Sequence, residues 1–378
     1  MPSCATDAWL APALRARQSD PHVVIAMSGG VDSSVAALRV RDAGLRCSAL
    51  FMKNWNEPAD DGRCRWEDDV ADALSVCEQI GIPLNTIDLS QAYWDGVFAD
   101  FVAEYQRGRT PNPDVLCNRE IKFKAFLTAA RSVGGDLIAT GHYVRSACGA
   151  GRWRLQAGLD QNKDQSYFLY TLGQQQLAAA VFPIGDLAKP EVRRRARAAG
   201  LATHEKKDST GICFIGERRF REFLSQYVAA TPGPLLTTDG RVVGQHHGAV
   251  YYTRGQREGL GIGGVRGAAA APWFVAAKDL AHNTVTVVQG HDHPALMSGA
   301  LVATSVCWIA GEPPSVPLQC SAKTRYRQVA AACTIEALAT DQVRVRFAAP
   351  QRAVTPGQSV VFYAGDVCLG GAVIDSVE

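Results

Sequence analysis

Short apolar runs alternate with segments of helical periodicity in the first third of the chain. Residues 22–27 (HVVIAM) form a continuous apolar run, which suits a strand that is buried on both faces. Residues 35–44 then carry apolar side chains at helical spacing and end at Gly44, a residue typical of a helix C-terminus. The same reasoning predicts further strands at 45–52, 83–89 and 136–143, and helices at 67–81, 94–105 and about 117–131. Strands that alternate with helices predict an α/β fold with a doubly wound parallel sheet.

The pattern changes toward the C-terminus. From about residue 298 the chain shows only strand signals, such as the strict alternation of VRVRF at 343–347 and the apolar run SVVFY at 359–363. These signals predict a small antiparallel β-barrel. Residues 232–264 contain a DG turn between short apolar stretches, which indicates a β-hairpin. We therefore expect four parts: a flexible leader at 1–20, an α/β domain at 21–224, a central domain at 225–296 and the barrel at 297–378.

The composition is that of a folded protein without a strong overall charge. The 378 residues include 47% hydrophobic and 20% charged residues and carry a net charge of only +2, so any nucleic-acid surface must come from local clusters of Lys and Arg. No apolar run reaches the length of a membrane span, and residues 1–20 lack the features of a signal peptide. The eleven cysteines include no CxxC pair, which argues against a disulfide scaffold and a structural metal site. Reduced thiols and a cytoplasmic location are expected.

The heptad SGGVDSS at 28–34 follows the first predicted strand and leads into a helix. Its two glycines let the backbone approach a ligand, and free N–H groups with the three serine hydroxyls form a cradle for phosphate. It is not a Walker loop, because the lysine of GxxxxGK[ST] is missing. The alternative is a plain glycine turn in which Asp32 or Ser33 caps the helix. Ligands of such sheets bind beyond the carboxyl ends of the strands, where three of the residues fall: Ser28, Met52 and Gly141.

A proline-rich segment at 109–126 (RTPNPDVLCNREIKFKAF) places Cys117 near a predicted helix start. The helix dipole, with Arg119 and Lys122 nearby, favours a thiolate there. Asp114 is a candidate acid or base. The alternative is that Cys117 is buried and inert, as unpaired cysteines usually are.

Cys213 lies in DSTGICFIG (208–216), between glycines and downstream of Lys206 and Lys207. This setting also predicts an exposed thiol in an electropositive environment. Two such cysteines suit sulfur transfer, in which one carries a persulfide and the other resolves it as a disulfide.

Nine segments together resemble one family. They cover nearly the whole chain after the leader and include MSGGVDSS, LFMKNW, GRTPNPDVLCNREIKFKAF, ATGHYV, NKDQSYFLY, KKDSTGICFIGERRFREFL, GQREGLGIGG, KTRYRQ and TPGQSVVFY. On these motifs the chain is similar to the bacterial tRNA-specific 2-thiouridylases of the ATP-pyrophosphatase (PP-loop) superfamily. The resemblance implies a sulfurtransferase that adenylates the 2-oxygen of the wobble uridine with ATP and Mg²⁺, and then replaces that oxygen with sulfur. It also implies tRNA (the anticodon stem-loop) and a sulfur-relay protein or cysteine desulfurase as partners, no membrane, and a monomer.

The resemblance assigns roles to individual residues. Cys117 is the nucleophile, Cys213 the persulfide carrier, and the two form a transient disulfide. ATP is expected on the PP-loop and two strand ends: Ala26, Met27, Ser28, Gly29, Gly30, Val31, Asp32, Ser33, Met52 and Gly141. The target base is expected on Asn112, Pro113 and Asp114. Contacts with tRNA are expected from His142, Lys163, Asp164, Gln165, Arg325, Tyr326 and Gln358.

Other interpretations stay open at this point. The loop alone also fits another PP-loop ATP pyrophosphatase, such as an amide-forming or guanidinium-forming synthetase, or a non-catalytic protein that binds RNA or nucleotide. NKDQ (162–165) is by itself a polar turn, and His142 an ordinary hydrogen-bonded loop residue. The four arginines within 193–197 are either a solvated helix face or, with Arg218, Arg219 and Arg221, a track for RNA phosphates.

Overall fold

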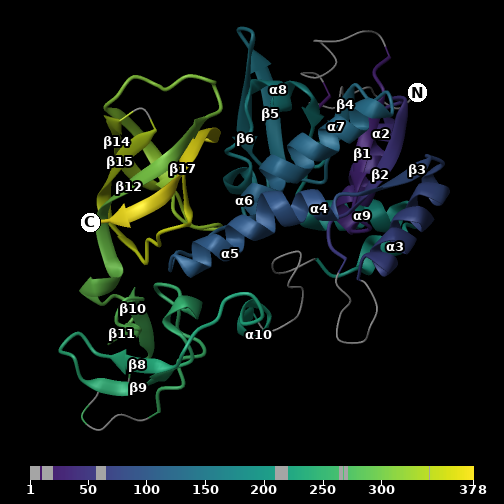
Figure 1. Cartoon of the computed structure of the whole chain (residues 1–378). Coiled ribbons are helices and arrows are strands. Elements are labelled where there is room, and N and C mark those ends of the chain that lie inside the picture. Colours follow the sequence, from purple (N-terminus) through teal and green to yellow (C-terminus); the bar gives the residue numbers. More distant parts are fainter. Residues whose placement is uncertain are drawn as a thin grey trace.

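Three β-sheets organise the chain in the computed structural model (Figure 1). The structure describes residues 9–10, 20–56, 65–208, 220–263, 267, 271–339 and 341–378. One sheet is parallel, one is a small four-stranded sheet, and one is a large antiparallel sheet. The predicted leader lies largely outside the described residues, and so does Cys213.

The parallel sheet has the order β3-β2-β1-β4-β7. Its strands are β1 (Val23–Met27), β2 (Cys47–Lys53), β3 (Leu84–Asp88), β4 (Leu137–Ala139) and β7 (Ala180–Val181). Every residue of β1 is buried, as the apolar run predicts. The order reverses between β1 and β4, so the ends of these two strands face the site at which ligands bind in such sheets. The doubly wound fold is therefore confirmed.

Helices cover both faces of this sheet and link its strands (Figure 1). The α-helices here are α2 (Val31–Asp42), α3 (Arg65–Ile80), α4 (Ser90–Tyr93), α5 (Ala99–Gln106), α6 (Pro113–Leu116), α7 (Phe126–Ser132), α8 (Gln174–Ala178), α9 (Lys189–Ala198) and α10 (Phe220–Leu224). Two predicted helices contain π-helical turns, at Trp94–Phe98 and Cys117–Ala125. Short 3-10 helices lie at Ser166–Phe168, Ala202–Glu205, Ala249–Tyr251 and Pro294–Leu296. The apolar faces that the periodicity predicts pack on the sheet through Val97, Phe98 and Phe101.

The strand predicted at 136–143 is shorter than expected, because β4 ends at Ala139. Gly141 explains the early end. A Cβ at this position would lie 2.9 Å from the backbone of Asp32 and of Ser33. The chain therefore leaves the sheet in order to pass directly against the start of α2.

The antiparallel sheet contains a closed barrel and a hairpin from the first domain. The barrel strands are β12 (Met297–Trp308), β13 (Leu318–Lys323), β14 (Ala331–Ala339), β15 (Gln342–Arg352), β16 (Ser359–Ala364) and β17 (Val367–Val377), and β12 pairs with both β15 and β17. The hairpin β5 (Val144–Gly149) and β6 (Arg152–Ala157) joins through β6, whose Leu155 and Gln156 pair with β17. The barrel is confirmed, but the sequence pattern did not indicate that 144–157 would extend its sheet.

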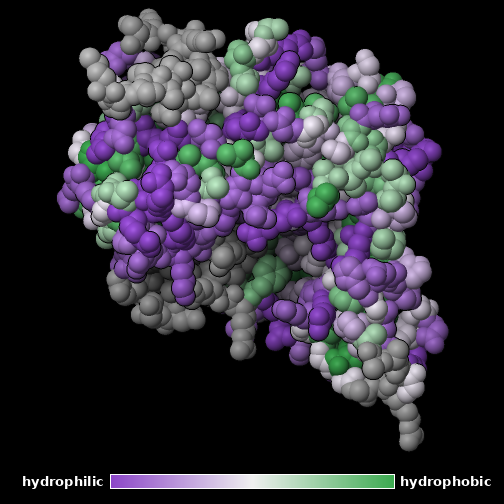
Figure 2. Space-filling view, turned by 180° about the vertical axis from the view of Figure 1, so that it is seen from behind, coloured by the Kyte–Doolittle hydropathy of each residue, from purple (hydrophilic) through white to green (hydrophobic). Residues whose placement is uncertain are grey.

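The central sheet has the order β10-β11-β8-β9. Its strands are β8 (Gly233–Leu236), β9 (Val242–His246), β10 (Trp273–Asp279) and β11 (Thr284–Gln289). The DG turn joins β8 and β9 as a hairpin, with the N–H of Thr237 donating to the carbonyl of Arg241. Figure 2 shows the opposite side of the molecule, where the surface is largely hydrophilic with small scattered apolar patches. Among the described residues no helix has the length and hydropathy of a membrane span.

Candidate functional site

The loop between β1 and α2 forms a compact turn at the start of the helix. Gly29 has φ +69°, and a Cβ there would lie 2.2 Å from the carbonyl oxygen of Asp69, so only glycine fits. Gly30 is the N-cap and offers no side chain to the helix. The hydroxyls of Ser33 and Ser34 both donate to the carbonyl of Gly30. The helix therefore lacks a capping side chain, as a loop that offers its N–H groups to an anion requires.

Asp32 points from the first turn of α2 into a cluster of charges. Lys189 Nζ lies 2.8 and 2.9 Å from its two carboxylate oxygens, and the hydroxyl of Tyr143 donates to it at 2.6 Å. Lys189 also pairs with Asp208 at 2.7 Å. Neither Asp32 nor Ser33 caps the helix, so the alternative reading of this loop is wrong for the described geometry.

Asp208 forms ion pairs with three basic side chains. Lys163 lies 2.6 Å from one carboxylate oxygen, and Lys189 and Arg193 lie 2.7 and 2.8 Å from the other. Burial raises the pKa of this carboxyl, but the hydrogen bonds from Lys163 and Lys189 outweigh burial and hold the pKa at about 2. The sequence motifs assign no role to Lys189 or Asp208, because the pair of Lys189 with Asp32 joins segments that are 157 residues apart.

The segment with Cys117 is fixed by local capping. The side chain of Asn112 accepts from the N–H of Asp114, and Pro113 occupies the first position of α6. Burial raises the pKa of Asp114, although the charge of Lys122 opposes the shift. Cys117 is only 2% exposed and packs in the main core. Burial of Cys117 is the property that the inert interpretation predicts, so its role as nucleophile stays a prediction.

Cys213 and the residues 209–219 lie outside the described residues. Two flanking features are described. Lys206 Nζ pairs with Asp69 at 2.7 Å and with Asp72, which ties the start of this segment to α3. On the other side the chain resumes at α10, whose Phe223 and Leu224 are buried in the main core.

The four residues predicted to contact tRNA near β4 are held by internal contacts. His142 is buried, its Nδ1 lies 2.8 Å from the hydroxyl of Thr140, and burial keeps its pKa well below the usual range. Lys163 pairs with Asp208, and the side chain of Gln165 accepts from the N–H of Tyr143.

Asp164 is the most enclosed of the four. Its carboxylate accepts from the N–H groups of Gly158 and Ser166, and it pairs with Lys323 of β13 at 2.9 Å. Its side chain is 3% exposed, so its carboxylate links the hairpin region to the barrel instead of facing solvent.

The TPGQ turn of the barrel, which contains the predicted tRNA contact Gln358, lies beside the loop with Asn112. The side chain of Gln358 donates to the carbonyls of Thr110 and Pro111 at 2.7 and 3.2 Å. Gly357, with φ +91°, lets the TPGQ turn come so close that a Cβ would lie 2.8 Å from the N of Thr110. Tyr326 packs on Phe168, with ring centroids 4.4 Å apart. These contacts place the barrel directly on the predicted base-binding loop.

The arginine run on α9 is engaged with acidic groups. Arg194 and Arg195 pair with Glu191 at 2.7 Å, and Arg193 donates to Asp208 and to the carbonyls of His204 and Lys206. Glu191 is thereby held at a pKa of about 2. The charges of this run are largely balanced within the helix and its neighbours, which favours the solvated helix face over a phosphate track.

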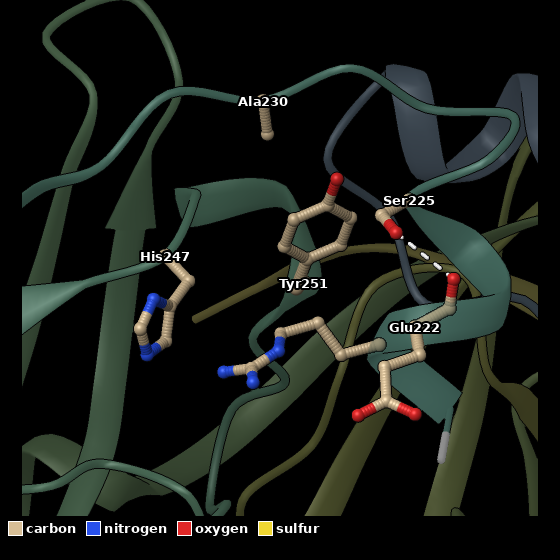
Figure 3. Close-up of a pocket in the computed structure, with 6 residues that line it drawn as sticks. Glu222, Ser225, Ala230, His247 and Tyr251 are labelled. Atoms are coloured by element: carbon tan, nitrogen blue, oxygen red, sulfur yellow. Dashed lines mark hydrogen bonds between the residues drawn. The ribbon is translucent and has the colours of Figure 1, made fainter. Parts of the chain in front are cut away.

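A cavity of about 250 Å³ lies between α10 and the central domain (Figure 3). Glu222 and Ser225 line it from α10 and its C-terminal extension, and His247 and Tyr251 line it from the segment after β9. Arg221 and Ala230 complete the wall. The cavity contains none of the predicted nucleotide or base residues, so it is separate from the PP-loop.

Three family models match the chain in the same order as its three sheets. They are described as the tRNA methyl transferase HUP domain (residues 21–217), the tRNA methyl transferase PRC-barrel domain (221–289) and the aminomethyltransferase beta-barrel domain (298–374). Among solved structures, an NMN synthetase from Francisella tularensis is similar with a TM-score of 0.34 and 20% identity, over 53% of this chain and 71% of that chain.

Curated relatives match over almost the full length. The tRNA-specific 2-thiouridylase MnmA of Pseudomonas fluorescens is 57% identical over 359 residues, which are 94% of this chain and 95% of that relative. The protein of the same name from Yersinia pestis is 55% identical over 358 residues, 94% of this chain and 96% of that relative.

The fold and the loop thus define an α/β protein of the HUP class that carries a PP-loop, followed by two β domains. Within that class, the chain belongs to the tRNA-specific 2-thiouridylase family of sulfurtransferases. The family expected from the motifs is confirmed.

Proposed function

We propose that this chain converts the wobble uridine of tRNA to 2-thiouridine, with ATP as the activating substrate. The observation that carries the proposal is the position of the PP-loop. The uncapped start of α2 lies at the switch point of the sheet, and Gly29 and Gly141 allow the backbone to approach closely there. A triphosphate fits such a site, because free N–H groups and the helix dipole favour an anion. The other predicted nucleotide residues, from Ala26 to Ser33 with Met52, adjoin the same strand ends.

Magnesium fits beside this loop. Asp32 is a partly exposed carboxylate in the first turn of α2, and Mg²⁺ in nucleotide sites takes one or two carboxylates together with phosphate oxygens and water. The ion would neutralise charge on the phosphates as pyrophosphate leaves. The role of Lys189 follows from its contacts: it holds Asp32 in place and supplies a positive charge next to the loop.

The target base would enter between α6 and the barrel. Asn112, Pro113 and Asp114 lie on the loop that Gln358 and Gly357 fix from the barrel side. A base must leave its stack to reach such a loop, which requires contacts to the flanking nucleotides. Tyr326, three residues after the end of β13, offers a ring for stacking, and Arg325 offers a charge.

The chemistry proceeds in two stages. The uracil 2-oxygen attacks the α-phosphate of ATP, so that pyrophosphate leaves and the oxygen becomes part of a good leaving group. The terminal sulfur of a persulfide on Cys213 then attacks the uracil carbon, and AMP leaves. Cys117 thiolate attacks the Cys213 sulfur, which frees the thiocarbonyl and forms a Cys117–Cys213 disulfide. An external thiol reduces this disulfide, and a sulfur donor protein restores the persulfide.

Cys117 must become accessible for this step, because the described state buries it. The π-helical turns at Cys117–Ala125 are a backbone feature that is often found at functional sites. Asp114, with its raised pKa, is the candidate acid or base for the proton that the reaction moves.

The test compares tRNA thiolation by wild type, Cys213→Ser and Cys117→Ser with a persulfide donor, ATP and Mg²⁺. We expect both variants to bind tRNA and to form no 2-thiouridine, as read by mass spectrometry of the nucleosides. Cys148→Ser, at an exposed site on β5, is the matched control and should retain full activity. Full thiolation by the Cys213 variant would contradict the proposed sulfur route.

A further inference from the structure

Three arginines meet at the seam between the central domain and the barrel. Arg254 follows the 3-10 helix of the central domain, Arg325 follows β13, and Arg352 ends β15. The side-chain nitrogens Arg325 Nη2 and Arg352 Nη1 lie 3.5 and 3.6 Å from the position that a Cβ on Gly255 would take. The guanidinium groups of Arg325 and Arg352 therefore converge on one glycine.

Their hydrogen bonds go to uncharged acceptors. Arg325 Nη2 donates to the carbonyls of Arg254 and Ala353 and to the hydroxyl of Thr355, at 2.8 to 3.1 Å. Arg352 Nε donates to the carbonyl of His291, and the guanidinium lies 4.8 Å from the ring centroid of Phe274.

Arg254 is held in the same way. It donates to the hydroxyl of Ser298 and to the carbonyls of Ala295 and Val354. No carboxylate of the described residues lies within ion-pair distance of any of the three arginines.

This absence of counter-charge distinguishes the cluster. Among the described side chains, every other arginine is exposed or is paired with a carboxylate, as Arg39, Arg109 and Arg145 are. Burial lowers the pKa of Arg325, and the positive charges of Arg352 and Arg254 lower it further. Two of the nitrogens, Arg254 Nε and Arg352 Nη2, are buried without a hydrogen-bond partner. Like charges held together without an anion cost stability, so the arrangement is incomplete within the described protein.

Several donors remain for an anion. Within the described part of the chain, Arg325 Nε and Nη1 and Arg352 Nη1 donate to no protein group. These atoms are not among the buried unpartnered ones, so solvent reaches them. A Cβ on Gly255 would lie 2.5 Å from the Cβ of Ala353, so glycine lets this backbone pack against Ala353 beside the two guanidinium groups.

The cluster adjoins the predicted base-binding loop. Thr253, the residue before Arg254, has its hydroxyl 3.2 Å from that of Thr110. Thr355, which accepts from Arg325, begins the TPGQ turn that packs on Thr110. An anion bound by Arg325 and Arg352 would therefore lie close to the segment that leads to Asn112. A tRNA strand whose base entered that loop would pass this position.

We propose that Arg352 and Arg325, with Arg254 behind them, form a socket for one phosphodiester group of the tRNA strand next to the target nucleotide. This inference rests on the proposed function and adds Arg352 and Arg254 to it. Guanidinium groups match phosphate oxygens in pairs, and phosphate contacts fix the register of a bound strand without reading its sequence. Arg325 and Arg352, which hold the free donors, both belong to the barrel, and Arg254 of the central domain supports them through its carbonyl, which accepts from Arg325.

The test measures tRNA binding by filter retention over a series of salt concentrations for wild type, Arg352→Gln and Arg346→Gln. Arg346 lies on the same strand β15, is exposed and pairs with Glu336, so it matches the change in charge at a site away from the seam. We expect Arg352→Gln to weaken binding about tenfold and to reduce the slope of log K against log salt by about one, the value for one lost phosphate contact. Arg346→Gln should leave both unchanged.

Further arms separate the proposal from a structural role. Arg352→Lys keeps the positive charge but loses the planar guanidinium that can bind two phosphate oxygens at once. Its salt slope should stay near that of wild type, and its affinity for tRNA should fall less than that of Arg352→Gln. ATP binding and the thermal midpoint of each variant show whether the fold is intact. An unchanged salt slope in a folded Arg352→Gln overturns the inference. A second outcome also overturns it. Inorganic phosphate would raise the thermal midpoint of wild type but not of Arg352→Gln, while both proteins bind tRNA with equal affinity, so the site would bind free phosphate and not the tRNA. Failure of wild type to thiolate tRNA would instead overturn the proposed function.

Discussion

Lys189 Nζ lies 2.8 Å from Asp32 Oδ1 and connects the first turn of α2 to the start of α9. The lysine side chain is 10% exposed, and it pairs with Asp208 as well. One buried cation therefore holds two carboxylates at the edge of the PP-loop.

The first prediction concerns Lys189→Met. The variant leaves Asp32 and Asp208 with less positive charge beside the loop, and their repulsion of a triphosphate should weaken ATP binding about tenfold. Calorimetric titration with a non-hydrolysable ATP analogue and Mg²⁺ measures the effect. Arg194→Gln, an exposed arginine on the same helix, serves as the control and should bind ATP normally. Equal affinity of Lys189→Met and wild type would show that Lys189 only supports the fold.

The second prediction concerns pH and Asp208. Its folded-state pKa is about 2, below the ordinary value of about 3.9. A depressed carboxyl pKa stabilises the fold above the unfolded pKa, and the contribution disappears as pH falls through the folded pKa. The stability gap between wild type and Asp208→Asn should therefore be constant above about pH 5 and shrink as pH falls from about 4 toward 2. Thermal midpoints over a pH series measure it, with exposed Asp42→Asn as control. A gap that does not change with pH argues against the ion cluster.

The third prediction concerns Gly357→Ala. Its φ of +91° and the 2.8 Å approach to Thr110 mean that a methyl group must push the TPGQ turn away from the base-binding loop. We expect a loss of stability of about 1–3 kcal/mol and a marked fall in the thiolation rate, with ATP binding unchanged. Urea unfolding and single-turnover thiolation are the measurements.

Gly365→Ala is the matched control for this variant. Gly365 also has a positive φ of +62° in the barrel, but a Cβ there meets nothing within 4 Å. It should lose some stability and keep the thiolation rate. A similar rate loss in both variants would indicate a general effect on the barrel.

The fourth prediction concerns the ion pair between Asp164 and Lys323. Asp164 is 3% exposed and Lys323 18% exposed, so removal of one partner leaves a buried charge. Asp164→Asn should reduce the free energy of unfolding by about 3 kcal/mol, and a double-mutant cycle with Lys323→Met should show positive coupling. The exposed pair of Arg346 and Glu336 should contribute less than about 1 kcal/mol. A coupling energy no larger than that of this exposed pair would contradict a stabilising buried ion pair between Asp164 and Lys323.

The sequence predicts the parallel sheet well because its signals are local. The apolar run at 22–27 and the heptad after it determine a strand, a turn and a helix start without reference to distant residues. The family motifs then add Met52 and Gly141 to the predicted nucleotide site. Alternation of strands and helices places Gly141 at a strand end, but its close approach to the backbone of Asp32 depends on the strand order, which only the structure provides.

The contacts that complete the site could not be predicted in this way. Lys189 pairs with Asp32 across 157 residues and also with Asp208, and nothing in the local sequence marks either contact. Asp164 has the appearance of a polar turn residue, and only its pairing with Lys323 reveals that it is interior. Burial and ion pairing of polar side chains depend on which elements meet in space, and apolar periodicity carries no information about that.

The β5–β6 hairpin also has a consequence for how the protein can be shortened. Its strand β6 satisfies backbone groups through β17, a strand that is synthesised more than 200 residues later. A chain that ends before residue 297 would expose the free edge of β6, and such edges recruit strands from other molecules. We expect such a shortened chain to aggregate even though the α/β sheet itself is complete. During synthesis β6 has no partner on this edge until β17 has been made. The last strand of the barrel therefore also completes the backbone hydrogen bonding of a hairpin in the first domain.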